Sequence, residues 1–184
     1  VKNQGNCGSC WSFSTTGSIE GVNAIKKNKL INASEQQLMD CSKSYGNNGC
    51  QGGLMDNAFK WIEKNGGLCL EKDYQYVSGE TKTAGTCEQS CSQVEGSVIV
   101  DYCDVPASSD EDMMYALSKQ PVSVAIQADQ KDFQLYKSGV FTGECGTKLD
   151  HGVLLVGYGS EENGDYYLLK NSWGETWGDE GYIK

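Results

Sequence analysis

The chain of 184 residues has no arginine, one histidine and two prolines, and these scarcities restrict what it can do. Because lysine alone supplies the 15 basic groups against 25 acidic ones, the net charge at pH 7 is −10. Such an excess of negative charge argues against nucleic acid or an anionic membrane as partner. Long hydrophobic runs are also missing, since no segment approaches the roughly eighteen apolar residues of a transmembrane helix.

The single histidine narrows the possible catalytic chemistry. A nucleophilic thiol needs a base, and the only imidazole available is His151. The candidate nucleophile is Cys10, in the segment Gln4-Gly5-Asn6-Cys7-Gly8-Ser9-Cys10-Trp11. The histidine lies in Leu149-Asp150-His151-Gly152-Val153, and Lys170-Asn171-Ser172-Trp173-Gly174 follows twenty residues later.

Taken together, these motifs resemble the papain/cathepsin L family of cysteine endopeptidases. The family carries the local signature Cys-Gly-(Ser/Ala)-Cys-(Trp/Tyr), with the histidine and asparagine about 130–150 residues downstream. His151 lies 141 residues after Cys10, and Asn171 lies 161 after it, slightly long, which a modest insertion explains. The resemblance covers essentially the whole chain, and it implies a cathepsin L-like or plant papain-type domain, truncated at both ends of the mature enzyme.

The expected fold class is α+β, with the two lobes of papain and an active-site cleft between them. Residues 1–104 are expected to form a mainly helical lobe that carries Cys10. Residues 105–184 are expected to form a β-rich, barrel-like lobe that carries His151 and Asn171, with the last strands of the family domain outside this sequence.

Local patterns predict the individual elements. Helices are expected from Cys10 to about Lys29, after a capping box of Ser34 and Gln37, from Met55 to Asn65, and from Asp110 to Lys119. Strands are expected at 98–100 and 122–126, and in a hairpin of 153–156 with 166–169 whose loop contains Asn163-Gly164.

Nine cysteines in this length indicate an oxidising compartment, and the odd number leaves one thiol unpaired. Three alternatives remain open from the residues alone. Cys7 and Cys10 could form a thioredoxin-type redox pair; Cys7, Cys10, Cys87 and Cys91 could bind zinc; or all nine could be structural. The family resemblance implies instead that Cys7 pairs with Cys50 and Cys41 with Cys87. It leaves Cys145 as half of a third bridge, and Cys69, Cys91 and Cys103 without assigned partners.

The resemblance also implies the catalytic roles. Cys10 attacks the peptide carbonyl as a thiolate, and His151 holds its proton and returns it to the leaving amine. Asn171 orients the imidazole, Trp173 covers that hydrogen bond, and Gln4 donates to the oxyanion. No metal and no organic cofactor is expected.

Trp173 and further residues are expected to bind substrate by the same resemblance. Gly52 and Gly53 would pair their backbone with an extended peptide. Asp150 would contribute through its backbone beside His151. The side chain second from the scissile bond would be accepted by Leu54, Met55, Ala125, Leu149 and Gly152.

The function predicted from the sequence is a cysteine-type endopeptidase made as a zymogen. Its expected partners are protein and peptide substrates, its own propeptide and cystatin-type inhibitors, and it is expected to be a monomer in the lysosome, the vacuole or the extracellular space. The alternative is a non-catalytic papain-like binding protein, because a fold alone does not prove activity. The sequon Asn32-Ala33-Ser34 leaves glycosylation open.

Overall fold

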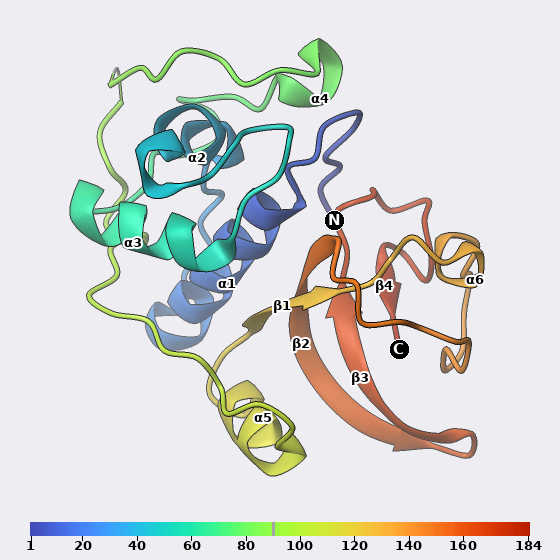
Figure 1. Cartoon of the computed structure of the whole chain (residues 1–184). Coiled ribbons are helices and arrows are strands. Elements are labelled where there is room, and N and C mark those ends of the chain that lie inside the picture. Colours follow the sequence, from blue (N-terminus) through green and yellow to red (C-terminus); the bar gives the residue numbers. More distant parts are fainter. Residues whose placement is uncertain (90) are drawn as a thin grey trace.

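The computed structural model describes residues 1–89 and 91–184, and places helices beside a twisted sheet (Figure 1). One hydrophobic core contains Trp11, Leu38 and Ile62, and we call the part built around it the helical side. A second core contains Phe133 and Tyr136, and we call the part built around it the sheet side. The helical side holds α1 (Cys10–Lys27), α2 (Glu35–Cys41), the 3-10 helix η1 (Lys43–Tyr45), α3 (Met55–Asn65) and α4 (Ser78–Thr81).

Helix α1 is the central element of the helical side and is covered on nearly every face (Figure 1). Trp11 is 1% exposed, while Ser12 and Thr16 are buried as well, so the helix needs polar contacts around it. The hydroxyl groups of Thr15 and Thr16 donate hydrogen bonds to backbone carbonyls of the preceding turn. The helix ends at Asn28 in the left-handed conformation, after Lys26 and Lys27, whose charge suits a helix C-terminus.

The sheet side contains four antiparallel strands in the order β1-β2-β3-β4. These are β1 (Val122–Ile126), β2 (His151–Glu161), β3 (Gly164–Lys170) and β4 (Tyr182–Ile183). The predicted hairpin is present, but its strands extend to Glu161 and Gly164, so only two residues form the loop. Gly164 adopts a φ of 120°, which favours glycine at this turn.

Two short helices flank the sheet. Helix α5 (Asp110–Leu117) begins after Ser109, whose hydroxyl accepts from the amide of Asp112, and it ends two residues earlier than predicted. Helix α6 (Lys131–Gln134) contributes Phe133 to the core of the sheet side. Among the described residues, none of the helices combines the length and the apolar character needed to cross a membrane.

Two local expectations are wrong. Residues 98–100 form no strand, because only Ile99 packs against the core, while Val98 is 56% and Val100 86% exposed. The capping box is only half formed. Ser34 caps α2 by accepting from the amide of Gln37, but the Gln37 side chain accepts from the amide of Cys69 instead of reaching back.

Three disulfides join parts of the helical side. The two pairings that the resemblance implies, Cys7–Cys50 and Cys41–Cys87, are both formed, and Cys69 pairs with Cys91. The redox pair and the zinc site are therefore wrong, because Cys7, Cys87 and Cys91 are already bonded to other cysteines. Cys10, Cys103 and Cys145 keep free thiols.

Candidate active site

Cys10 lies at the first position of α1, where backbone N–H groups and the helix dipole favour a negative charge. The turn before it is held against the disulfide segment, since the amide of Gly8 donates to the carbonyl of Cys50 at 3.0 Å. A Cβ at Gly8 would lie only 2.4 Å from that carbonyl oxygen, so glycine is required there. The thiol is partly exposed and can therefore meet a substrate.

The start of β2 brings His151 to the thiol from the sheet side. The amide of Gly152, the residue after His151, donates to the Cys10 Sγ at 3.3 Å. A Cβ at Gly152 would lie 3.3 Å from the Trp11 Cα, so a larger residue would push β2 away from α1. Ser14 reinforces the approach, because its hydroxyl donates to the carbonyl of Val153 at 2.7 Å.

Asn171 fixes the tautomer of the imidazole. Its Oδ1 accepts from the backbone amide of Ser172 at 2.8 Å, which identifies that atom as the carbonyl oxygen. The same oxygen lies 2.7 Å from the His151 Nε2, so this nitrogen must carry the proton that is donated. The Nδ1 is then the atom left to exchange a proton with a thiol.

Trp173 covers this hydrogen bond from one side. Its ring stacks on the His151 ring with 4.8 Å between the centroids. Phe133 and Trp177 pack edge-on against Trp173 and hold it in place. Because His151 and Asn171 are only 7% and 4% exposed, water has little access to the bond, which strengthens it.

The side chain of Gln4 is oriented by two hydrogen bonds. Its Oε1 accepts from the Ser172 hydroxyl and its Nε2 donates to the Cys7 carbonyl, both at 2.8 Å. An amide nitrogen carries two hydrogens, so a second N–H is available to a ligand. The carbonyl of Gln4 also accepts from Tyr76, which the sequence patterns did not indicate as part of the site.

Burial shifts the pKa values of Cys10 and His151 in opposite directions. It raises the pKa of the Cys10 thiol, and the hydrogen bond from Gly152 only partly offsets this effect. It lowers the pKa of His151, against the opposing influence of the Asn171 hydrogen bond and of Asp150. Each group considered with its surroundings alone therefore favours its neutral form.

The predicted substrate-binding residues flank this centre from both sides. Ala125 and Gly152 face each other across β1 and β2, and Leu149 is 64% exposed just before β2. From the helical side, Leu54 is 62% exposed, and Met55 begins α3.

Three other predicted residues take local structural positions. A Cβ at Gly53 would lie 2.7 Å from the Trp11 ring, whereas one at Gly52 would meet open space. The Asp150 carboxylate accepts from the amide of Ala128 at 2.7 Å, so its side chain ties the β1 end to the His151 segment.

Comparisons with known proteins agree with this arrangement. A family profile described as papain family cysteine protease matches residues 1–184. The chain belongs to the papain family of cysteine proteases. The two-lobe α+β fold expected from the sequence is confirmed, because solved structures of plant papain-like proteases superpose on the whole chain.

Similar proteins come from several plants. The chain is 53% identical over 184 residues to the probable cysteine protease RD21B of Arabidopsis thaliana, covering 39% of that protein. It is 52% identical over 188 residues to the cysteine proteinase EP-B 1 of Hordeum vulgare, covering 49% of it. The chain thus spans about half or less of the length of these curated relatives, and all of it is matched.

Among solved structures, bromelain from Ananas comosus in complex with the E64 inhibitor is 44% identical, with a TM-score of 0.90. That match covers all of this chain and 81% of bromelain. The ragweed pollen allergen Amb a 11 in its proform is also 44% identical, with a TM-score of 0.90, and 49% of that protein is covered.

Proposed function

We propose that this chain carries a cysteine endopeptidase site that hydrolyses internal peptide bonds. Cys10 attacks the carbonyl and forms a thioester, His151 protonates the leaving amine, and water then releases the acyl group with His151 as base. The observation that carries this proposal is the contact of the Gly152 amide with the Cys10 Sγ at 3.3 Å, since it brings the backbone next to the only histidine of the chain to the thiol.

The reactive state requires proton transfer from Cys10 to His151. Burial opposes either charge alone, but an ion pair about 4 Å apart gains roughly 4 kcal/mol at an effective dielectric constant of 20. The helix N-terminus and the Gly152 amide add to the stabilisation of the thiolate. The pair should therefore titrate as a unit, with apparent pKa values that belong to neither residue separately.

The oxyanion of the tetrahedral intermediate would be bound by two donors. The backbone amide of Cys10 is one of the first N–H groups of α1, which have no partner within the helix. The second N–H of Gln4 Nε2 supplies the other. Loss of one such donor typically lowers kcat by about 10²–10³-fold, which is the loss we expect for Gln4→Ala.

We further propose that the two sides are lobes comprising residues 1–104 and 105–184, with the substrate lying between them. Their separate hydrophobic cores support this division. The backbone of Gly52 and Gly53 would bind an extended peptide, and Leu54, Met55, Ala125, Leu149 and Gly152 would contact the side chain second from the scissile bond. Their apolar or small side chains suit Leu, Phe or Val at that position.

The three disulfides fit an oxidising environment. We propose a vacuolar, lysosomal or secreted location, a propeptide that blocks the cleft before activation, inhibition by cystatin-type proteins, and a monomeric state. The proform structure of the ragweed relative supports the propeptide.

The test is hydrolysis of a long unstructured peptide, with products identified by mass spectrometry. Internal cleavage that is lost in Cys10→Ala and in His151→Ala, both with unchanged melting temperature, supports the proposal. The non-catalytic alternative predicts that the folded wild-type protein binds such peptides without cleaving them at any pH between 4 and 8.

A further inference from the structure

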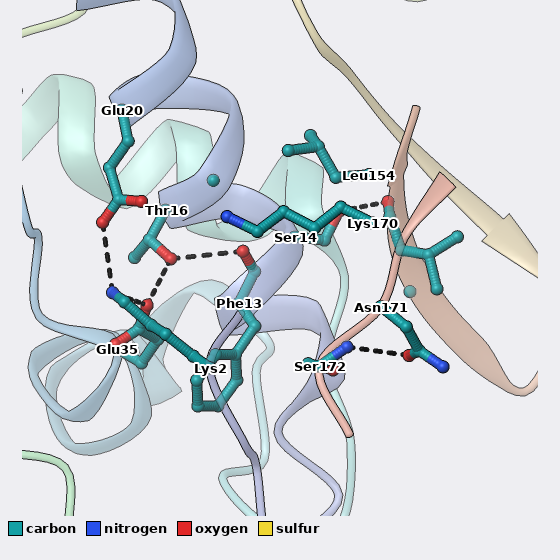
Figure 2. Close-up of a pocket in the computed structure, with 13 residues that line it drawn as sticks. Lys2, Phe13, Ser14, Thr16, Glu20, Glu35, Leu154, Lys170, Asn171 and Ser172 are labelled. Atoms are coloured by element: carbon teal, nitrogen blue, oxygen red, sulfur yellow. Dashed lines mark hydrogen bonds and ion pairs between the residues drawn. The ribbon is translucent and has the colours of Figure 1, made fainter. Parts of the chain in front are cut away.

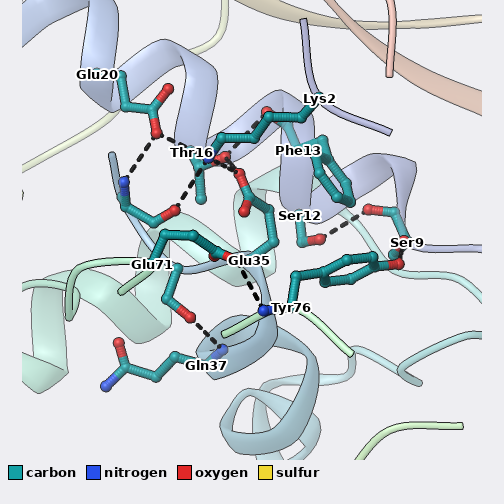
Figure 3. A network of polar contacts seen from close by, with 12 residues as sticks. Lys2, Ser9, Ser12, Phe13, Thr16, Glu20, Glu35, Gln37, Glu71 and Tyr76 are labelled. Carbon is teal, nitrogen blue, oxygen red and sulfur yellow. Dashed lines mark hydrogen bonds and ion pairs between the residues drawn. The ribbon is translucent and has the colours of Figure 1, made fainter. Parts of the chain in front are cut away.

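A cluster of two buried acids and one half-buried lysine lies behind the site, and the proposed mechanism does not use it. The Lys2 ammonium contacts Glu20 Oε1 at 3.1 Å, Glu35 Oε1 at 2.5 Å and the carbonyl of Ala33 at 3.2 Å (Figure 3). These contacts occupy all three of its donors. The Glu35 side chain is 1% exposed and that of Glu20 10%, whereas the acids of the other ion pairs among the described residues are 39% exposed or more.

This cluster fixes the Lys2 side chain to the helical side. Glu20 is on α1 and also accepts from the amide of Ala33 at 2.9 Å. Glu35 is the first residue of α2 and also accepts from the Thr16 hydroxyl at 2.6 Å. The ammonium is therefore held by two helices and by the loop between them.

The backbone of the same short segment is bound to the sheet side. The carbonyl of Lys2 accepts from the amide of Gly174 at 3.1 Å, and the amide of Gln4 donates to the carbonyl of Ser172 at 2.8 Å. Asn3 and Trp173, which lie between these two hydrogen bonds, pair as an isolated antiparallel β-bridge. Residues 2–4 thus pair with the three residues that directly follow Asn171.

A second lysine reaches the same region from the sheet. Lys170, the residue before Asn171, lines a cavity of about 20 Å³ together with Lys2, Glu20 and Glu35 (Figure 2). The segment that carries Asn171 and Trp173 is therefore linked to the acidic pair through Lys2, and its neighbouring lysine lines the same cavity.

Stability alone does not account for such a cluster. Removing charges from water costs about as much as their attraction returns, and well-packed apolar residues often serve as well or better. What an ion cluster with three directed contacts does provide is a fixed position. We propose that Lys2 is a positioning residue, which registers the segment carrying Asn171 and Trp173 against α1 and thereby sets His151 relative to Cys10.

This inference rests on the proposed function for its effect on catalysis, but the geometry can be measured without a substrate. The probe is the rate at which iodoacetamide alkylates Cys10 at pH 6, compared with the exposed thiol of Cys103 in the same molecule. A thiol reacts as thiolate, so a displaced imidazole slows Cys10 but leaves Cys103 unchanged.

Two Lys2 variants are compared with one matched control. Lys2→Met leaves two acids without their shared partner and can fail to fold, so Lys2→Met/Glu20→Gln/Glu35→Gln replaces all three ionisable side chains together. The control is Lys27→Met, which breaks the exposed pair with Glu95 at the far end of α1. All proteins are titrated with a peptidyl epoxide, so that rates refer to folded sites.

We expect Cys10 alkylation to fall about tenfold or more in every Lys2 variant that folds, since a misplacement near 1 Å can cost on the order of 10²-fold. The kcat per titrated site should fall in parallel, with little change in KM, while Lys27→Met equals wild type. Wild-type rates in the folded triple variant would overturn the proposal. Fast alkylation of wild-type Cys10 without peptide cleavage would instead contradict the protease function and leave the positioning role standing.

Discussion

The two sides of the molecule are stabilised by different means, and each contributes half of the reacting pair. The helical side carries Cys10 and all three disulfides, which lie between residues 7 and 91. The sheet side carries His151 and depends on an aromatic cluster, with a groove of about 920 Å³ open beside it. The segments around the nucleophile are therefore cross-linked by disulfides, whereas the base is held only by hydrogen bonds and side-chain packing.

This difference predicts that mutations on the sheet side will disturb catalysis more than equally destabilising ones on the helical side. Phe133→Ala removes a ring that is 4% exposed and packs against Trp173, and should cost about 3–5 kcal/mol of stability. Ile62→Ala, at 0% exposure in the other core, should cost about 2–5 kcal/mol. Urea unfolding would give these values.

The two variants should separate in kcat per titrated site. Phe133→Ala should lower it, because Trp173 loses its support against His151, whereas Ile62→Ala should leave it unchanged. Equal losses of kcat in both variants would show that the site responds to general stability rather than to the aromatic cluster.

The contribution of the disulfides to the helical side is tested by removing one of them. Cys41→Ser/Cys87→Ser opens a loop with a sequence separation of 46 and should lower the free energy of unfolding by about 3–4 kcal/mol. Cys103→Ser and Cys145→Ser change exposed free thiols and should stay within about 0.5 kcal/mol of wild type. A comparable loss of stability in Cys103→Ser or Cys145→Ser would contradict the view that only the helical side is cross-linked.

The smallest expected effect is a change of the free energy of unfolding with pH. It comes from Glu35, in the cluster with Lys2 and Glu20 that joins the two sides. Burial raises the pKa of Glu35 from 4.5 to about 7, and the attraction of Lys2 only partly offsets it. The folded protein therefore binds the proton of the Glu35 carboxyl more tightly than the unfolded chain does. The protonated carboxyl contributes its full stability below about pH 4.5, and this stability is lost as pH rises toward 7.

Glu35→Gln should therefore gain stability relative to wild type between pH 4.5 and 7.5, by roughly 2–3 kcal/mol. Urea unfolding at both pH values measures this difference. The matched control is Glu95→Gln, which makes the same substitution at a carboxylate that is 95% exposed. A constant difference between Glu35→Gln and wild type would mean that the carboxyl titrates normally.

The sequence allowed the elements that bear the motifs to be predicted well. The start of α1 at Cys10, the strand at 122–126 and the hairpin after His151 are confirmed, because their periodicity and turn residues act locally. The strand at 98–100 was wrong for the opposite reason. A β-branched run has no strand partner unless a neighbouring segment supplies one, and here none of the described segments does.

Contacts between distant polar residues were beyond sequence reasoning. Nothing in the pattern indicated that Lys2 would meet Glu20 and Glu35, or that Tyr76 would donate to the carbonyl of Gln4. Such pairs depend on how helices and loops pack rather than on local preference. The Cys69–Cys91 bridge belongs to the same class, since the residues alone left its partner open.

We infer that the only histidine of the chain activates Cys10, one of its three free thiols. The most direct measurement treats the folded protein with a peptidyl epoxide at pH 5.5 and pH 7 and maps the adducts by mass spectrometry. We predict a single adduct on Cys10 at both pH values, none on the exposed Cys103 or Cys145, and loss of the adduct in His151→Ala. Equal labelling of all three thiols, or labelling of Cys10 that persists in His151→Ala, would contradict the account.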